Sequence, residues 1–221
     1  LLQHPLIGGV ILFSRNYESQ EQLSELTLKI HQLRRPSLLI AVDHEGGRVQ
    51  RFKNGFSQLP ACGLIGKCEP LAKAKQLAEN TGWLMAIELL SVGVDFSFAP
   101  VLDIGGEISE VIGDRAFHIE PDKISKLANS YMLGMRKAGM SAVGKHFPGH
   151  GSVIEDSHIS IPLDNRQFDD ILLQDIIPFK ALIEAGIPGL MPAHITFPEI
   201  DDRPAGFSSI WLNEILRKQL K

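Results

Sequence analysis

Five short apolar runs alternate with amphipathic stretches along the chain, and this alternation limits the fold more than any other feature. Nearly continuous apolar runs joined by helices are typical of parallel strands that are covered on both faces. Helical spacing is clearest within residues 19–35, at Leu23, Leu26, Ile30 and Leu33. We therefore predict an α/β fold. The predicted strands cover residues 6–13, 37–43, 94–103, 141–146 and 189–195, and the predicted helices lie within residues 19–35, 69–92, 121–138, 168–185 and 208–221.

Polar side chains follow the predicted strands at the points where the strands end. They include Asp43, Asp103, Lys145, His146 and His194. Ligands of parallel α/β folds bind at the carboxyl ends of the strands. Reactive residues from four strand ends fit the mouth of a barrel better than a single crevice. We therefore favour a TIM (β/α)8 barrel over a doubly wound open sheet.

The spacing of the strands limits how much of a barrel the chain can form. Strand starts near residues 7, 38, 94, 142 and 188 give about 45 residues per βα unit. Eight such units need roughly 360 residues, within the usual range of this fold. The 221 residues therefore correspond to an incomplete barrel of about five units. No linker or break in composition divides the chain, so we expect one domain over residues 1–221.

Composition excludes several classes of function. The chain holds 22 Lys and Arg against 26 Asp and Glu, and this net charge of −4 argues against a nucleic-acid-binding surface. No apolar run approaches the roughly 18–20 residues of a membrane helix, and no signal peptide is visible. The two cysteines, Cys62 and Cys68, are typical of free thiols in a reducing compartment rather than of a disulfide framework.

Histidine placement is the sharpest chemical signal. Asp156 precedes His158 by two residues, and an Asp that holds one ring nitrogen fixes the tautomer and raises the basicity of the other. This pair is a candidate general acid/base, although an isolated Asp-x-His is most often a solvated turn. The same two residues with His146 and His150 could form a zinc site on a loop. Nothing in the sequence requires a metal, so we expect none.

The other strand-end residues have both a functional and an ordinary interpretation. Lys145 and His146 can clamp hydroxyls or an anion, or they can be a lysine reaching to solvent and a core histidine. Asp43 can cap the turn that follows it. Arg115 can bind a ligand through two donors, or it can belong to a surface ion pair with Asp114. His194 is either a core histidine or a site residue. Two further features are weaker: Gly46-Gly47 lacks the dinucleotide-binding spacing, and Gly149 and Gly151 suggest a mobile loop.

At fixed spacing, Lys145-His146-Phe147-Pro148-Gly149-His150-Gly151 and Asp156-Ser157-His158 resemble the signature of bacterial β-N-acetylglucosaminidases of glycoside hydrolase family 3. Residues 43–51 (DHEGGRVQR) resemble a second landmark of the family, which more often has Gln in place of His44. Further family-like segments are residues 98–103, 112–115 and 191–194. The resemblance covers essentially the whole chain.

This resemblance implies a TIM barrel that removes terminal N-acetylglucosamine with retention of configuration, through a covalent intermediate on an Asp nucleophile. His158 is implied as the acid/base and Asp156 as its partner. The residues implied to contact the sugar are Asp43, Arg115, Lys145 and His146, with Arg51 a weaker candidate. No cofactor is implied. A retaining hydrolase needs one group that protonates the leaving oxygen and then deprotonates water, and an imidazole can do both.

The sequence departs from the family pattern in one respect. The family's nucleophile follows a segment of the type G-V-I-F-S-D-D, and no such segment occurs in these residues. We therefore expect the chain to cover the family's strands two to six, truncated at both ends. Two alternatives remain open, an inactive sugar-binding fragment and a phosphorolytic enzyme. The expected ligand is an N-acetylglucosamine-containing oligosaccharide, either a muropeptide from peptidoglycan in the cytoplasm or a chitin-like chain.

Overall fold

A computed structural model describes residues 1–106, 108–153 and 162–221 of the chain. Its strands form two parallel groups, one in the order β1-β2-β5 and one pairing β6 with β7. The segment after β5 joins the groups: the N–H of Val143 donates to the carbonyl of Ala99 (2.8 Å), and the N–H of Leu102 donates to the carbonyl of Lys145 (2.7 Å). The five predicted strands thus follow one another in space. They are β1 (Gly9–Leu12), β2 (Leu39–Val42), β5 (Phe96–Ser97), β6 (Val143–Phe147) and β7 (Gly189–Pro192).

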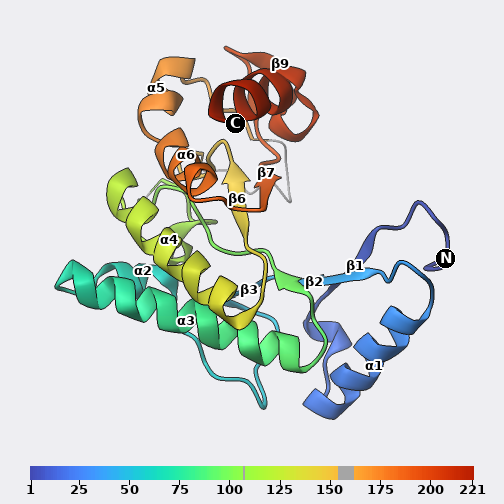
Figure 1. Ribbon diagram of the computed structural model, residues 1–221. Helices are drawn as coiled ribbons and strands as arrows, with labels where there is room; N and C mark the ends of the chain where they lie inside the picture. The colour runs from blue at the N-terminus through green and yellow to red at the C-terminus, as the bar shows by residue number, and fades with distance from the viewer. Residues whose placement is uncertain (107, 154–161) are drawn as a thin grey trace.

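Helices follow the strands as the periodicity predicts (Figure 1). The Ser19 hydroxyl caps the helix that begins at Gln20 by accepting from the N–H of Gln22. Pro121 is the first residue of another helix, where a backbone N–H would have no partner within the helix, so the missing N–H of proline costs no hydrogen bond. The α-helices are α1 (Gln20–Gln32), α2 (Cys62–Gly66), α3 (Leu71–Ser91), α4 (Pro121–Ala138), α5 (Phe168–Leu173) and α6 (Ile176–Glu184). The described residues also form three short 3-10 helices, η1 (Ser14–Asn16), η2 (Gly113–Arg115) and η3 (Ala205–Phe207), and a π-helix, η4 (Ile210–Leu220).

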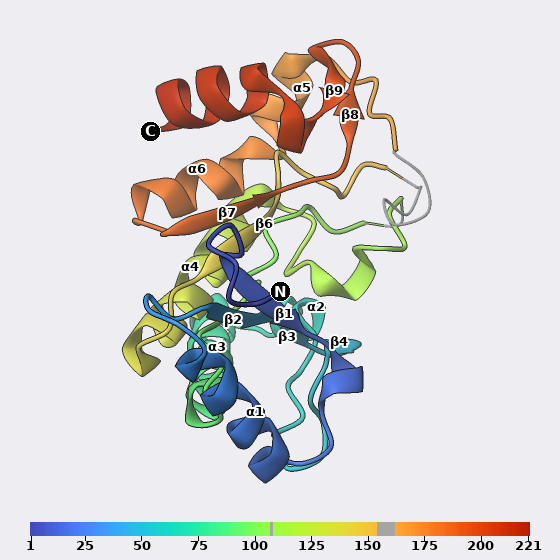
Figure 2. The same cartoon turned by 90° about the vertical axis from the view of Figure 1, so that its right-hand side faces the viewer.

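The core lies between the strands and these helices. Helices α3 and α4 run side by side in both views, and α6 packs against β6 (Figures 1 and 2). Large side chains from distant parts of the chain fill the interior, among them Phe52, Tyr131, Phe147 and Trp211, each fully buried. Cys62 and Cys68 are both free thiols, as expected. No helix in the described ranges is long and apolar enough to cross a bilayer.

The structure confirms the α/β fold but does not show a closed barrel. In the described part of the chain, β1 pairs only with β2, and β7 pairs only with β6. Two apolar strand residues point to solvent, with Ile11 48% and Leu39 56% exposed. The strand array is therefore open in these residues, and the barrel stays a prediction.

Residues 168–185, which are predicted to contain a helix, hold two, α5 and α6. A continuous helix would place Pro178 in its interior, where the ring clashes with the carbonyl of residue 174. The chain instead breaks at Gln174, and Pro178 falls in the first turn of α6. Asp175, at the break, accepts hydrogen bonds from Arg166 at 2.8 Å and 3.2 Å.

Two antiparallel hairpins were not predicted from the apolar pattern. They pair β3 (His44–Gly46) with β4 (Val49–Gln50), and β8 (Thr196–Phe197) with β9 (Asp201–Pro204). Their strands are too short and too polar to give a recognisable alternation. The first hairpin directly follows β2 and brings three charged residues to the carboxyl end of the sheet, Glu45, Arg48 and Arg51.

Gly149 and Gly151 are required by close packing, which the mobile-loop interpretation did not foresee. A Cβ atom on Gly151 would lie 2.0 Å from the carbonyl oxygen of Ile104. Gly149 has φ +150°, and a Cβ there would lie 2.6 Å from a carboxylate oxygen of Asp175. These glycines therefore let the segment after β6 pass directly over its neighbours.

Gly151→Ala is expected to destabilise the fold, because the obstructing atom belongs to the backbone and cannot rotate away. Overpacking of this kind costs about 1–3 kcal/mol. Urea unfolding monitored by circular dichroism measures the loss. Gly8→Ala is the matched control, since nothing lies within 4 Å of a Cβ at that position. Equal stabilities for the two variants would contradict the packing argument.

Candidate functional site

A cavity of about 220 Å³ opens at the carboxyl ends of the strands. Its lining holds eight ionisable side chains, Asp43, Glu45, Arg51, Arg115, Lys145, His146, His150 and His194. Larger grooves exist elsewhere, but the one of about 410 Å³ near the end of α4 carries Arg136 as its one ionisable lining residue. The concentration of charge, rather than size, distinguishes the strand-end cavity as the candidate site.

Lys145 is the central cation of this cavity. It stands on β6, and its side chain is only 2% exposed. Its ammonium lies 2.8 Å from Asp43 Oδ1 and 2.5 Å from Glu45 Oε1. A lysine reaching to solvent, one of the two interpretations of the sequence, is therefore wrong. The ammonium is held inside by two carboxylates from the end of β2 and from β3.

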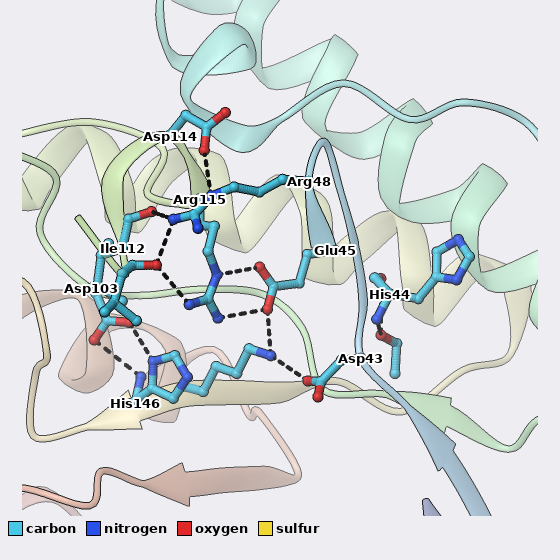
Figure 3. A network of polar contacts seen from close by, with 12 residues as sticks. Asp43, His44, Glu45, Arg48, Asp103, Ile112, Asp114, Arg115 and His146 are labelled. Atoms are coloured by element: carbon cyan, nitrogen blue, oxygen red, sulfur yellow. Dashed lines mark hydrogen bonds and ion pairs between the residues drawn. The ribbon is translucent and has the colours of Figure 1, made fainter. Parts of the chain in front are cut away.

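Arg115, which ends η2, meets the same carboxylate from the other side. Its Nε and Nη2 donate to the two oxygens of Glu45 at 2.9 Å and 2.8 Å, and its Nη1 donates to the carbonyl of Val111 at 3.0 Å (Figure 3). The alternative interpretation, a surface pair between Arg115 and Asp114, is wrong, because Asp114 pairs with Arg48 at 3.2 Å. Glu45 therefore joins the two predicted cations, Lys145 and Arg115.

Electrostatics explain why Glu45 is stable as a buried carboxylate. Burial by itself raises the pKa of a carboxyl group, because it disfavours the charged form. The charges of Lys145 and Arg115, and their hydrogen bonds, outweigh burial and lower the pKa of Glu45 to about 2. In the same way, burial would lower the pKa of Arg115, but its contacts with Glu45 raise it. Glu45 and Arg115 are therefore both charged at neutral pH.

Asp103 holds the other side of the site. Its side chain is fully buried, and Oδ2 lies 2.6 Å from Nδ1 of His146. Its Oδ1 accepts the backbone N–H groups of His146 (3.1 Å) and His150 (2.8 Å). Burial would raise the pKa of Asp103, but His146 and these hydrogen bonds keep it below its usual value. Figure 3 shows Asp103 and His146 on one flank and Asp43 on the other.

His44 turns away from the cavity although it follows Asp43 directly. Its ring centroid lies 5.8 Å from that of Phe52 and 5.9 Å from that of Phe56. Burial, with a smaller contribution from Arg51, lowers its pKa to about 4. His44 is therefore a neutral member of an aromatic cluster behind the site.

Five of the seven residues singled out by the sequence come together here. Arg51 completes the set, with Nη2 3.9 Å from Asp43 Oδ2. The other two, Asp156 and His158, lie outside the described residues. His194 is exposed and lines the cavity, so its interpretation as a core histidine is wrong.

Sequence reasoning assigned no role to Glu45, and it named Asp103 only as a polar residue at the end of a strand. Glu45 stands two residues after Asp43 in the segment 43–51, and Asp103 ends a predicted strand, so position along the chain was an available signal. The sequence does not reveal that the side chains of Glu45 and Asp103 are buried. Their partners, Arg115 and His146, stand 70 and 43 residues further along the chain.

Among the residues that the structure describes, no group of three or more His, Cys, Asp or Glu side chains is arranged so that it could hold a zinc ion. His146 Nδ1 faces Asp103, and the rings of His146 and His150 lie 5.6 Å apart in an edge-on arrangement. The remaining two candidate ligands, Asp156 and His158, are not described.

Comparison with known proteins assigns a family to this arrangement. The model of the glycosyl hydrolase family 3 N terminal domain matches residues 1–221, so the chain belongs to that family. Curated β-hexosaminidases of Hydrogenovibrio crunogenus and Methylobacillus flagellatus are 59% and 55% identical over 99% of the chain. The chain spans 62% and 63% of their lengths, which is less than two thirds.

Solved structures agree with this assignment. NagZ from Neisseria gonorrhoeae in complex with N-trifluoroacetyl-D-glucosamine matches with a TM-score of 0.95 and 47% identity, over 99% of this chain and 66% of that one. NagZ from the same organism has also been solved with a zinc ion. A family 3 β-N-acetylglucosaminidase from Paenibacillus sp. str. FPU-7 matches with a TM-score of 0.90 and 32% identity, over 96% of this chain and 41% of that one.

Glu45→Gln is expected to lower the free energy of unfolding by about 3–5 kcal/mol at pH 7, because it leaves two buried cations without their shared carboxylate. Glu45 has a depressed pKa in the folded protein, so its contribution is complete above its ordinary pKa of 4.5 and is lost as the pH falls toward 2. The difference between wild type and variant should therefore narrow from about pH 5 downward.

Urea unfolding at several pH values measures this difference. Asp114→Asn is the control, because its pair with Arg48 is about half exposed on both sides and should contribute less than about 1 kcal/mol. A difference between wild type and Glu45→Gln that stays constant with pH would contradict the assigned charge of Glu45.

Proposed function

We propose that this chain carries the sugar-binding and acid/base machinery of a retaining exo-β-N-acetylglucosaminidase. The observation that carries the proposal is the convergence of Asp43, Arg115, Lys145 and His146 in one cavity, in a member of family 3. Support for the sugar comes from the relatives, one of which was solved with an N-acylated glucosamine. The β-hexosaminidase names of the curated relatives support the reaction class.

In this proposal the cavity works in two layers. Asp43, Arg51 and His146 keep 26%, 33% and 17% of their side chains exposed and contact the sugar hydroxyls. Lys145 and Arg115 stand deeper and donate from fixed positions, because the buried Glu45 holds both. Donors and acceptors fixed before binding stabilise developing charge without reorganisation, which favours the transition state over the ground state.

We assign the acid/base role to His158, with Asp156 as its partner, on the resemblance to the family signature. In a retaining reaction the imidazolium protonates the leaving glycosidic oxygen, and the imidazole then takes a proton from the water that releases the sugar. The covalent intermediate needs a nucleophilic carboxylate, and we assign that role to none of these 221 residues.

We further propose that residues 1–221 are one domain corresponding to strands two to six of a TIM barrel.

Muropeptides derived from peptidoglycan, hydrolysed in the cytoplasm, are the substrate class that we propose. Chitin-like oligosaccharides are the competing class. A mixture of N-acetylglucosaminyl muropeptides and chitobiose, followed by mass spectrometry, separates the two by their rates of N-acetylglucosamine release.

The direct test is hydrolysis of an aryl N-acetyl-β-glucosaminide by a protein that contains these residues together with a nucleophilic carboxylate, and we expect N-acetylglucosamine of retained configuration as the product. The assay is run with and without inorganic phosphate. An unchanged rate and no sugar phosphate would remove the phosphorolytic alternative. Binding of N-acetylglucosamine without turnover would support the inactive sugar-binding fragment instead, and neither binding nor turnover would overturn the proposal.

In a preparation that hydrolyses these substrates, His158→Ala is expected to slow substrates with poor leaving groups by on the order of 10²–10⁴-fold, the usual contribution of a general acid. Activated aryl substrates need little protonation of the leaving oxygen and should lose far less in the glycosylation step. Steady-state kcat/KM over a series of aryl leaving groups measures the difference. Equal losses across the series would exclude the acid role.

A further inference from the structure

Asp103 determines which nitrogen of His146 carries the proton. Its two oxygens face three groups, the ring Nδ1 of His146 at 2.6 Å and the backbone N–H groups of His146 and His150 at 3.1 Å and 2.8 Å. A carboxylate can only accept hydrogen bonds. Nδ1 must therefore be the donor, and in the neutral imidazole Nε2 keeps its lone pair.

This tautomer adds a nitrogen acceptor to the cavity, which also holds the carboxylate of Asp43. The ring of His146 lines the cavity, and since Nδ1 faces Asp103, Nε2 is the ring nitrogen available to a ligand there. The nearby cations Arg51, Arg115 and Lys145 can only donate. A ligand group opposite Nε2 must therefore bring its own hydrogen.

We propose that Asp103 is a positioning residue that makes His146 a selective acceptor for one hydroxyl of the bound sugar. The inference rests on the proposed function in one respect, that the ligand is a sugar. A hydroxyl at this position donates a hydrogen bond to Nε2. Fluorine in its place has no hydrogen to donate, so that hydrogen bond is lost. Losing a hydrogen bond in a partly buried site should weaken binding by roughly 10- to 100-fold.

The geometry also predicts how Asp103→Asn would change the position of the ring proton of His146. The amide oxygen of the new side chain would stay with the two backbone N–H groups, which need an acceptor. The amide nitrogen would then face Nδ1 and donate to it, so the ring proton would move from Nδ1 to Nε2. The substitution keeps the shape of the site and reverses the polarity that His146 offers to the ligand.

The first arm of the test needs no ligand and no activity. Nitrogen-15 NMR of the histidine rings, in a protein titrated until His146 is neutral, should show a protonated Nδ1 and an unprotonated Nε2. Asp103→Asn should reverse the two. The control is Asp95→Asn, which changes a carboxylate that contacts His31 at 3.1 Å and should leave the His146 signals unchanged. A protonated Nε2 in the wild type, or no reversal in a folded variant, would overturn the tautomer assignment.

The second arm measures the affinity of N-acetylglucosamine analogues in which each ring hydroxyl in turn is replaced by fluorine. We expect one position to cost the wild type roughly 10- to 100-fold and to cost Asp103→Asn much less. Equal losses in the two proteins would overturn the selective role of His146. If Asp103→Asn does not fold, the wild-type tautomer and the wild-type analogue series still decide the inference. If no sugar binds, the proposed function and the ligand part of this inference fail together, and the tautomer is judged by NMR alone.

Discussion

Two cations from separate parts of the chain converge on the buried carboxylate of Glu45, and this convergence fixes the positions of the donors in the site. Lys145 arrives from β6 and Arg115 from η2, and neither charge would be tolerated at this depth without an anion. A buried ion pair is weak support for net stability, because desolvation offsets much of the attraction. Its value here is positional, since it fixes two donors at the carboxyl ends of the strands.

Asp103 plays the corresponding part on the other flank, where it holds the imidazole ring of His146. Both anchoring carboxylates are almost completely buried, and the groups that they hold line the cavity. Lys145, Arg115 and His146 are thus oriented by carboxylates that are themselves almost completely buried. Such an arrangement lets a small cavity present both donors and acceptors without rearrangement on binding.

Much of this architecture could be predicted from the sequence, because periodicity and strand-end chemistry are local signals. The five strands, the limits of α4 and the convergence of Asp43, Lys145 and Arg115 follow from them. The break at Gln174 depends on where Pro178 falls within a turn, and the hairpin around Glu45 is too short for a pattern. The anchoring roles of Glu45 and Asp103 are contacts between distant segments, which no local pattern encodes.

The central claim is that this network of fixed charges forms a binding site for N-acetylglucosamine. A crystal structure of the chain soaked with N-acetylglucosamine tests it most directly. We expect the sugar in the strand-end cavity, with hydroxyl groups within hydrogen-bond distance of the Asp43 carboxylate and of Nε2 of His146. A sugar bound elsewhere on the surface, or an empty cavity at a saturating concentration, would contradict it.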